Sequence, residues 1–241
     1  MSETDWSEPD HIADARNRLL DAALIHVAFD GWSKETLDAA VADTGVDAGL
    51  AKLAFPRGGV DMAVAFHDRG DAQLKAELEG GDLSGMGMTA KITHAVRRRL
   101  ELIAADREAV RRGATLLALP IYAADGSRAI WRTADTIWSA LGDTSTDYNF
   151  YTKRATLSAV YSATVLFWLG DDSPRSERTW DFLDRRIANV MQFEKVKAQV
   201  KESPIGRLWS AGPGRLAERM GARVAARRGE GMPPMPGTWS G

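Results

Sequence analysis

Hydrophobic side chains recur at helical spacing along most of this 241-residue chain, and this periodicity limits its fold more than any other feature. The strongest case follows the positions i, i+3, i+4, i+7, i+8 and i+11, which are occupied by Leu157, Val160, Tyr161, Thr164, Val165 and Trp168. No stretch alternates hydrophobic and polar residues over the length of a strand bounded by turn residues. The sequence therefore predicts an all-α fold.

Capping and turn residues divide the first third of the chain into helices. A first helix over residues 10–29 ends at Asp30 and Gly31, and the N-cap residues Ser33 and Asp47 predict helices over 33–44 and 47–54. A longer helix follows over 59–78. We expect this organisation: a disordered N-terminus (1–9), a helix-turn-helix-like subdomain (10–79), a glycine-rich boundary (80–87), a helical body (88–199), an amphipathic helix (203–228) and a disordered tail (229–241).

Charge is distributed unevenly along the chain. Residues 1–90 hold 17 acids and 7 bases, a net charge of −10, whereas residues 195–241 hold 3 acids and 9 bases, a net charge of +6. Clustered lysine and arginine are attracted to phosphate-rich surfaces, and an acidic surface is repelled by them. We therefore expect contact with an anionic membrane surface at the C-terminal end and no nucleic-acid partner.

The chain carries no sign of export or of membrane insertion. Residues 1–10 hold four acids and no base, unlike a secretory signal, and the longest apolar stretch, over 157–169, falls short of the roughly 20 residues that span a bilayer. There is no cysteine, which fits a reducing compartment and excludes disulfides and thiol nucleophiles. The expected location is cytoplasmic, peripheral at the inner membrane.

Motifs of the known enzyme classes are absent. The four histidines, His11, His26, His67 and His94, lie in no metal-ligand spacing such as H-E-x-x-H or E-x-x-H, and no phosphate-binding loop or G-x-S-x-G nucleophile motif occurs. We expect no catalytic residue, no metal and no cofactor, and thus a protein that is not an enzyme. A site assembled from carboxylates far apart in the sequence would carry no motif, so that alternative stays open.

The first four expected helices resemble the N-terminal domain of TetR-type regulators in their lengths and turn positions. A DNA-reading third helix presents basic and polar side chains to bases and phosphates, but here the segment reads DAGLAKLA, with Lys52 its only such residue. Residues 33–57 hold three bases and four acids. The helix-turn-helix is therefore interpreted as degenerate, and a ligand-responsive transcription regulator is the alternative function.

Four blocks of sequence carry a resemblance to a known family. The blocks are residues 55–67 with FPRGG and AFH, 147–154 with DYNFYTKR, 168–174 with WLGDDSP, and 180–187 with WDFLDRRI. In this order they resemble the ninth coenzyme Q biosynthesis protein family. The resemblance implies a TetR-like helical bundle without DNA binding, an apolar pocket for isoprenoid lipids, and a C-terminal amphipathic helix on the membrane. It also implies a non-enzymatic role, in which ubiquinone intermediates are taken from the membrane and presented to the di-iron demethoxyubiquinone hydroxylase.

Aromatic residues are concentrated in the body of the chain, where large apolar side chains suit the walls of an isoprenoid pocket. The residues expected to bind lipid are Leu116, Leu119, Trp131, Ile137, Trp138, Leu157, Tyr161, Val165 and Trp168. An ordinary aromatic core or a dimer face would use the same residue types, so both alternatives stay open.

Two further surfaces are expected. The first, expected to bind the hydroxylase, consists of Asp147, Phe150, Tyr151, Lys153 and Arg154; the alternative for Arg154 is an ion pair with a nearby acid. The second is an apolar stripe flanked by arginines and expected to bind membrane: Ile205, Leu208, Trp209, Leu216, Met220 and Val224. The alternative for this stripe is a helix docked on the protein itself or on a second copy in a homodimer.

Overall fold

The computed structural model describes residues 8–146 and 148–202, and within these ranges all regular structure is helical, which confirms the all-α prediction. The chain divides into two compact units, residues 1–187 and residues 188–241. Of the second unit, the described part is the stretch 188–202, which is helical throughout.

The second and third helices confirm the boundaries expected from the capping residues, and the first begins two residues earlier than expected. The three helices are α1 (Glu8–Asp30), α2 (Lys34–Thr44) and α3 (Ala48–Ala54). The side chain of Ser33 accepts a hydrogen bond from the backbone N–H of Thr36, and that of Asp47 accepts one from Leu50, so each residue caps the helix that follows it. Gly45 ends α2 with φ of 63°, a left-handed conformation that glycine adopts without strain.

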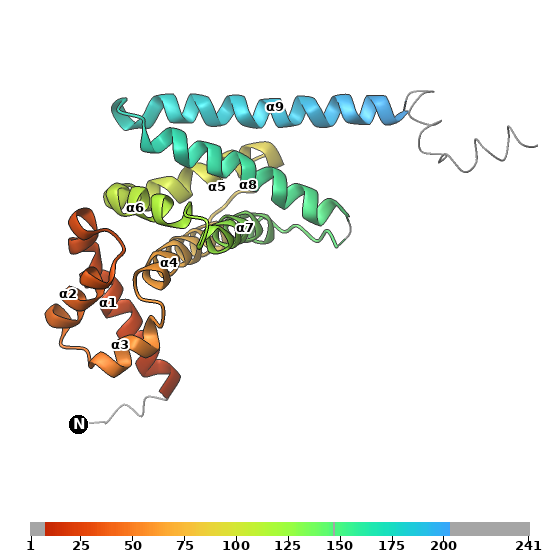
Figure 1. The fold of residues 1–241 in the computed structure, drawn as a ribbon. Helices are drawn as coiled ribbons and strands as arrows, with labels where there is room; N and C mark the ends of the chain where they lie inside the picture. The colour runs from red at the N-terminus through yellow and green to blue at the C-terminus, as the bar shows by residue number, and fades with distance from the viewer. Residues whose placement is uncertain (1–7, 147, 203–241) are drawn as a thin grey trace, which may run out of the picture. The chain divides into compact units, whose positions relative to one another are not determined.

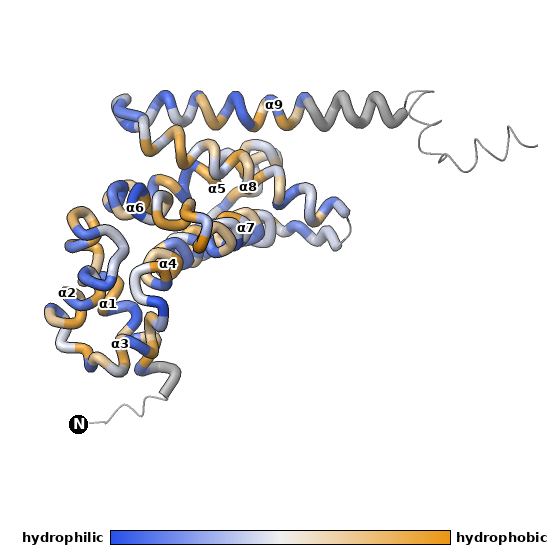
Figure 2. Tube along the Cα trace, in the orientation of Figure 1, coloured by the Kyte–Doolittle hydropathy of each residue, from blue (hydrophilic) through white to orange (hydrophobic). Residues whose placement is uncertain are grey.

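The body begins with α4, which leads from this three-helix group toward the remaining helices (Figure 1). After α4 (Gly59–Gly80) the helices are α5 (Met88–Leu102), α6 (Arg107–Leu117), α7 (Ala123–Ala140), α8 (Tyr148–Leu169) and α9 (Glu177–Glu202), with two short 3-10 turns, η1 (Ala104–Asp106) and η2 (Pro174–Ser176). Helix α7 packs on both α4 and α8, and α6 packs on α1, α4 and α7. Hydrophobic and hydrophilic residues alternate along these helices within a turn or two, as expected where one face is buried (Figure 2).

Trp32 joins the three-helix group to the body. Its indole Nε1 donates a hydrogen bond to the carbonyl of Ala109 at 2.9 Å, and its ring packs on Phe66 with the ring centroids 5.5 Å apart. The first residue of α4, Gly59, packs directly against the backbone of Trp32. Only glycine fits there, because a Cβ at position 59 would lie 2.1 Å from the carbonyl oxygen of Trp32. These contacts fix the start of α4 and so the direction in which it enters the body.

Two arginines of α6 hold the C-terminal end of α8. Arg107 donates to the carbonyls of Trp168 and Asp171, and Arg111 donates to that of Leu169 at 2.7 Å. The last carbonyls of a helix have no partner within the helix, so these bonds satisfy groups that would otherwise be exposed. They also hold α6 beside α8.

Candidate functional site

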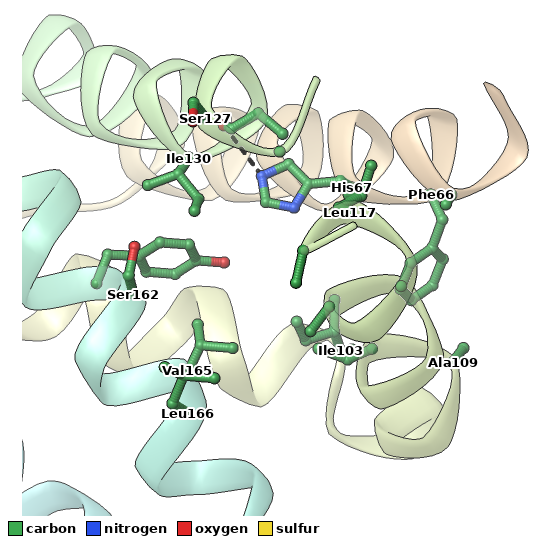
Figure 3. Close-up of a pocket in the computed structure, with 18 of the residues that line it drawn as sticks. Phe66, His67, Ile103, Ala109, Leu117, Ser127, Ile130, Ser162, Val165 and Leu166 are labelled. Carbon is green, nitrogen blue, oxygen red and sulfur yellow. Dashed lines mark hydrogen bonds between the residues drawn. The ribbon is translucent and has the colours of Figure 1, made fainter. Parts of the chain in front are cut away.

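A cavity of about 360 Å³ lies among α4, α5, α6, α7 and α8. Figure 3 shows labelled side chains from these elements around it, with Ile130 and His67 on one side and Val165 and Leu166 on another. The residues that line it are Ala63, Phe66, His67, Arg99, Ile103, Ala109, Val110, Gly113, Ala114, Leu117, Ala118, Ala123, Gly126, Ser127, Ala129, Ile130, Tyr161, Ser162, Val165 and Leu166. Most are apolar, and a volume of this size is near the lower end of the range for small-molecule sites.

Small residues create this space. Helix α6 presents alanine or glycine at Ala109, Gly113 and Ala114, and α7 does the same at Gly126 and Ala129. Neighbouring helices pack closely at these points: a Cβ on Gly126 would lie 2.9 Å from the carbonyl oxygen of Leu117. Close backbones bearing short side chains leave a hollow where longer side chains from α4 and α8 do not reach.

One part of the cavity wall is polar and belongs to a buried hydrogen-bond network. Nε2 of His67 lies 2.8 Å from Oγ1 of Thr133 and 3.2 Å from the carbonyl oxygen of Ala129. The Thr133 hydroxyl in turn lies 2.9 Å and 3.0 Å from the two carboxylate oxygens of Asp71, which also accepts a hydrogen bond of 2.7 Å from Nε of Arg99. Thr133 and Arg99 are 0% and 1% exposed, so this network lies in the core rather than in solvent.

The network balances its own charge. Arg99 and Asp71 form a buried ion pair, and Nη2 of Arg99 also donates to the carbonyl of His67 at 2.8 Å. Burial is the largest effect on the pKa of His67 and lowers it. The carboxylates of Asp71 and Asp68 raise this pKa, the positive charges of Arg99 and Arg132 lower it, and the net shift is downward. His67 is therefore a neutral imidazole at neutral pH.

Tyr161 is the second polar group at this end of the cavity. Its ring meets that of His67 edge to face, with the centroids 6.4 Å apart, and 3% of the residue is exposed. Burial raises the pKa of its phenol, so the side chain keeps its hydroxyl proton. The cavity thus combines a long apolar wall with a short polar end, an arrangement suited to binding a molecule that has an apolar chain and a small polar head.

The structure brings two of the nine residues expected to bind lipid, Tyr161 and Val165, to this cavity. Three others are buried in the core without lining it: Ile137, Leu157 and Trp168. Leu119 is exposed and Leu116 is half-buried. Trp131 lies near the ring of Tyr151, with the centroids 6.4 Å apart, and Nε1 of Trp138 donates to the carbonyl of Lys153.

Sequence reasoning did not single out the remaining lining residues, above all His67, Arg99 and the alanines and glycines of α6 and α7. A signal was present for the small residues: Ala109 and Gly113, like Ala114 and Ala118, are four apart and so lie on one face of α6. The pairing of Arg99 with Asp71, 28 residues earlier, had no such signal.

Four of the residues expected to bind the hydroxylase, Phe150, Tyr151, Lys153 and Arg154, lie in the first two turns of α8. Tyr151 is 62% exposed and packs edge to face on Phe150, and Tyr148 beside it is also exposed. Arg154, in contrast, is buried: its Nε donates to Asp135 at 2.6 Å and its Nη1 to Asp143 at 3.0 Å. Lys153 donates to the same Asp143 at 2.7 Å, and Asp147 lies outside the described residues.

The hydrogen bonds to Asp143 also set its protonation state. The ammonium of Lys153 first, with Ser145 and Arg154, holds the pKa of this carboxyl well below its usual range. Asp143 is therefore ionised at any pH at which the protein is studied, and the buried charge of Arg154 has a permanent counter-charge. These contacts favour the alternative that Arg154 forms an ion pair within the protein, rather than contacting the hydroxylase.

The residues expected to bind membrane, Ile205, Leu208, Trp209, Leu216, Met220 and Val224, all lie outside the described residues. Within the described ranges, no helix has both the length and the apolar character needed to cross a bilayer. Over the same ranges, no group of three or more histidine, aspartate or glutamate side chains is placed to hold a metal ion.

Comparison with known proteins links the chain to ubiquinone biosynthesis. The family model described as COQ9 matches residues 123–194. The mitochondrial ubiquinone biosynthesis protein COQ9 of Rattus norvegicus is 30% identical over 237 residues, which cover 95% of this chain and 72% of the relative. For Homo sapiens COQ9 the identity is 30%, covering 90% of this chain and 68% of the relative. The Drosophila melanogaster protein is also 30% identical, and this chain spans 58% of its length.

Among solved structures, the chain is similar to the TetR transcriptional regulator from Nitrosomonas europaea ATCC 19718. The TM-score is 0.60 and the identity 23%, covering 72% of this chain and 95% of the other. At this identity the likeness establishes the fold alone, and it confirms the predicted TetR-like arrangement.

Proposed function

The chain belongs to the COQ9 family of ubiquinone biosynthesis proteins, and from this we propose that it is an isoprenoid-lipid-binding accessory protein that is not itself an enzyme. It takes ubiquinone intermediates from the membrane and presents them to the demethoxyubiquinone hydroxylase. The observation that carries this proposal is the apolar cavity of about 360 Å³ with its polar end. Such a cavity removes the apolar surface of a prenyl chain from water, at roughly 25 cal/mol for each Å².

The cavity is suited to the head and the first part of a prenyl chain. Leu166 lines the cavity and is itself 67% exposed, so the apolar wall reaches the protein surface on α8. A long isoprenoid tail would leave the cavity there and continue along apolar surface. A protein that encloses only one end of its lipid leaves the remainder accessible to a membrane or to a partner.

Two surfaces complete the proposed mechanism. The exposed aromatic residues Tyr148 and Tyr151 at the start of α8 would contact the hydroxylase, because exposed aromatics are enriched at interface hot spots. The stripe between residues 205 and 224 would contact the anionic face of the cytoplasmic membrane, because the arginines beside an apolar stripe can reach lipid phosphates. That the protein acts as a homodimer stays a prediction.

The test is the lipid content of the purified protein. We expect the protein isolated without detergent to carry ubiquinone or a prenylated intermediate at near-stoichiometric amount, measured by lipid extraction and mass spectrometry. Val165→Trp fills the cavity and should abolish this cargo, whereas Ala159→Trp, on the exposed side of the same helix, should retain it. A wild-type protein that carries no lipid, or only bulk phospholipid, would overturn the proposal.

The second candidate function is a ligand-responsive transcription regulator, which is favoured by the fold. The surface of α3 argues against it: besides Lys52, the exposed residues of this helix are Ala48, Gly49 and Leu53. None of these three can donate a side-chain hydrogen bond to a base edge or a phosphate. We therefore rank this function below the first.

A further inference from the structure

The two ring nitrogens of His67 have different surroundings. Nε2 is bonded to Thr133 and Ala129, while Nδ1 has no hydrogen-bond partner among the residues that the structure describes. Figure 3 shows the imidazole with one nitrogen bonded, as the dashed line marks, and the other turned toward the open space on the side of Leu117. Nδ1 is thus a polar atom presented to the cavity.

The neighbours of Nε2 determine which nitrogen carries the proton. Asp71 is paired with Arg99 and can only accept hydrogen bonds, so the single hydroxyl proton of Thr133 points to Asp71. Oγ1 of Thr133 must then accept from Nε2, and the carbonyl of Ala129, 3.2 Å away, can also only accept. The network therefore assigns the proton to Nε2 and leaves a lone pair on Nδ1.

This assignment requires a neutral ring, and the surroundings keep it neutral. The nearest carboxylate oxygen of Asp71 lies 3.6 Å from Nε2, close enough to favour a charged imidazolium. Arg99 offsets it, because its guanidinium is buried in the same network and already neutralises Asp71. Burial of the imidazole acts in the same sense as Arg99.

We propose that Nδ1 of His67 accepts a hydrogen bond from the ring hydroxyl of a prenylated phenol or hydroquinone, so that the cavity binds these ligands in preference to the corresponding quinones. A quinone carbonyl carries lone pairs and no proton, and it would face the lone pair of Nδ1. The hydroxyl of Tyr161 carries both a proton and lone pairs, so it can pair with either form. Of these two side chains, His67 is therefore the one that discriminates between hydroquinone and quinone. This inference rests on the proposed function, in that the cavity must hold a prenylated ligand at all.

The direct test compares two ligands that differ in the ring protons alone. The probes are a benzoquinone with one short prenyl chain and the hydroquinone obtained from it, each measured by equilibrium dialysis in oxygen-free buffer. We expect the wild-type protein to bind the hydroquinone about tenfold more tightly, the effect of one ligand hydrogen bond in a site with little access to water. Equal affinities, or tighter binding of the quinone, would overturn the inference.

His67→Phe tests the residue. Phenylalanine keeps an aromatic ring in the wall but removes the acceptor, so the variant should bind hydroquinone and quinone with about equal affinity. Its affinity for the quinone should differ from that of the wild type by less than about threefold. Ser127→Ala is the matched control, because Ser127 also lines the cavity and its hydroxyl donates to the carbonyl of Ala123 within its own helix. The control should keep the tenfold preference, and a preference that persists in His67→Phe would overturn the assignment to His67.

A measurement on the wild-type protein does not depend on whether this variant folds. With nitrogen-labelled histidine, the Nδ1 resonance of His67 should shift when the hydroquinone is added and not when the quinone is added. A shift with both or with neither would overturn the inference. The wild type could bind both ligands equally well and lose both in Val165→Trp; the proposed function would then stand, although this inference would fall. If the wild type bound neither ligand, the proposed function itself would be overturned.

Discussion

Nη1 of Arg154 lies 3.0 Å from a carboxylate oxygen of Asp143, and the two side chains are 2% and 4% exposed. The bond ties α8 to the loop that follows α7, because α7 ends at Ala140, shortly before Asp143, and Arg154 belongs to the second turn of α8. The ring of Phe150 lies under the same guanidinium, with 3.5 Å between the guanidinium carbon and the ring centroid. A residue that the sequence places on a docking surface is thus a structural element of the α7–α8 junction.

Arg154→Leu should therefore destabilise the protein. Removal of one member of a buried ion pair destabilises a protein because the other charge loses that partner. Here Asp143 still keeps Lys153, so we expect a loss of about 3 kcal/mol of unfolding free energy, near the low end of the usual range. Urea denaturation measures this directly. The control is Arg128→Leu on α7, where the side chain is 71% exposed and the expected change is within about 0.5 kcal/mol. Equal stability of the two variants would contradict the structural role of Arg154.

Tyr151→Ala should behave in the opposite way. The side chain is 62% exposed, so its loss should change the unfolding free energy by less than about 0.5 kcal/mol, yet it should weaken association with the hydroxylase. Hydroxylase turnover in the presence of the protein, together with co-purification of the two, measures the effect. Ile25→Ala on α1 removes another exposed apolar side chain outside this surface and serves as the control. A parallel loss of stability and coupling would show that Tyr151 is structural.

Gly59→Ala should reverse the usual effect of this substitution within a helix. Alanine normally stabilises a helix relative to glycine, but here its Cβ would lie 2.1 Å from the carbonyl oxygen of Trp32, and the backbone must shift to accept it. We expect a loss of about 3 kcal/mol, the upper part of the range for overpacking. Gly80→Ala, at the end of the same helix and with no atom within 4 Å of the added Cβ, should be neutral or slightly stabilising. Thermal denaturation of the pair decides the point.

Local signals in the sequence predicted the helices well. The boundaries of α2 and α3 follow from Ser33, Gly45 and Asp47, whose side chains or backbone conformations act on the nearest turn and need no distant partner. The family resemblance found in four sequence blocks is confirmed by relatives of 30% identity over most of the chain. The capping signals depend on residues that are close together in the sequence, and the family resemblance depends on the order of the four blocks. Both can therefore be recognised without the structure.

The cavity and its polar end were harder to predict, because they depend on contacts between distant segments. Large aromatic residues predicted walls, but Trp168 packs in the core, and the cavity instead follows small residues such as Gly113 and Gly126, whose partners are on other helices. Arg99 occupies a core position next to Leu100, where a charged residue is not expected unless a partner is known. That partner, Asp71, is identified only once α4 and α5 are packed together.

The exposed face of α3 predicts that the protein does not bind DNA through its helix-turn-helix. Lys52 is the one base on α3, and over residues 33–57 three bases stand against four acids. Neutralisation of phosphates by clustered bases supplies most non-specific affinity for DNA, and here it has no counterpart. A gel-shift assay with the upstream region of the protein's own gene at low salt should show no complex. A complex whose affinity falls steeply with added salt would return the regulator function to first place.

The buried His67 predicts a pH dependence of stability with a defined sign. Its pKa in the folded protein lies below the ordinary value of 6.5, because burial, Arg99 and Arg132 outweigh Asp71 and Asp68. Below pH 6.5 the unfolded chain therefore binds a proton at His67 that the folded protein does not bind. The unfolding free energy should therefore be fully retained above pH 6.5 and should fall as the pH drops, by at most about 1.4 kcal/mol for each pH unit. His67→Phe removes the group, so the difference between wild type and variant, measured by urea denaturation between about pH 5 and 8, isolates its contribution. A difference that is constant over this range would show that the pKa of His67 is the same in the folded and unfolded states.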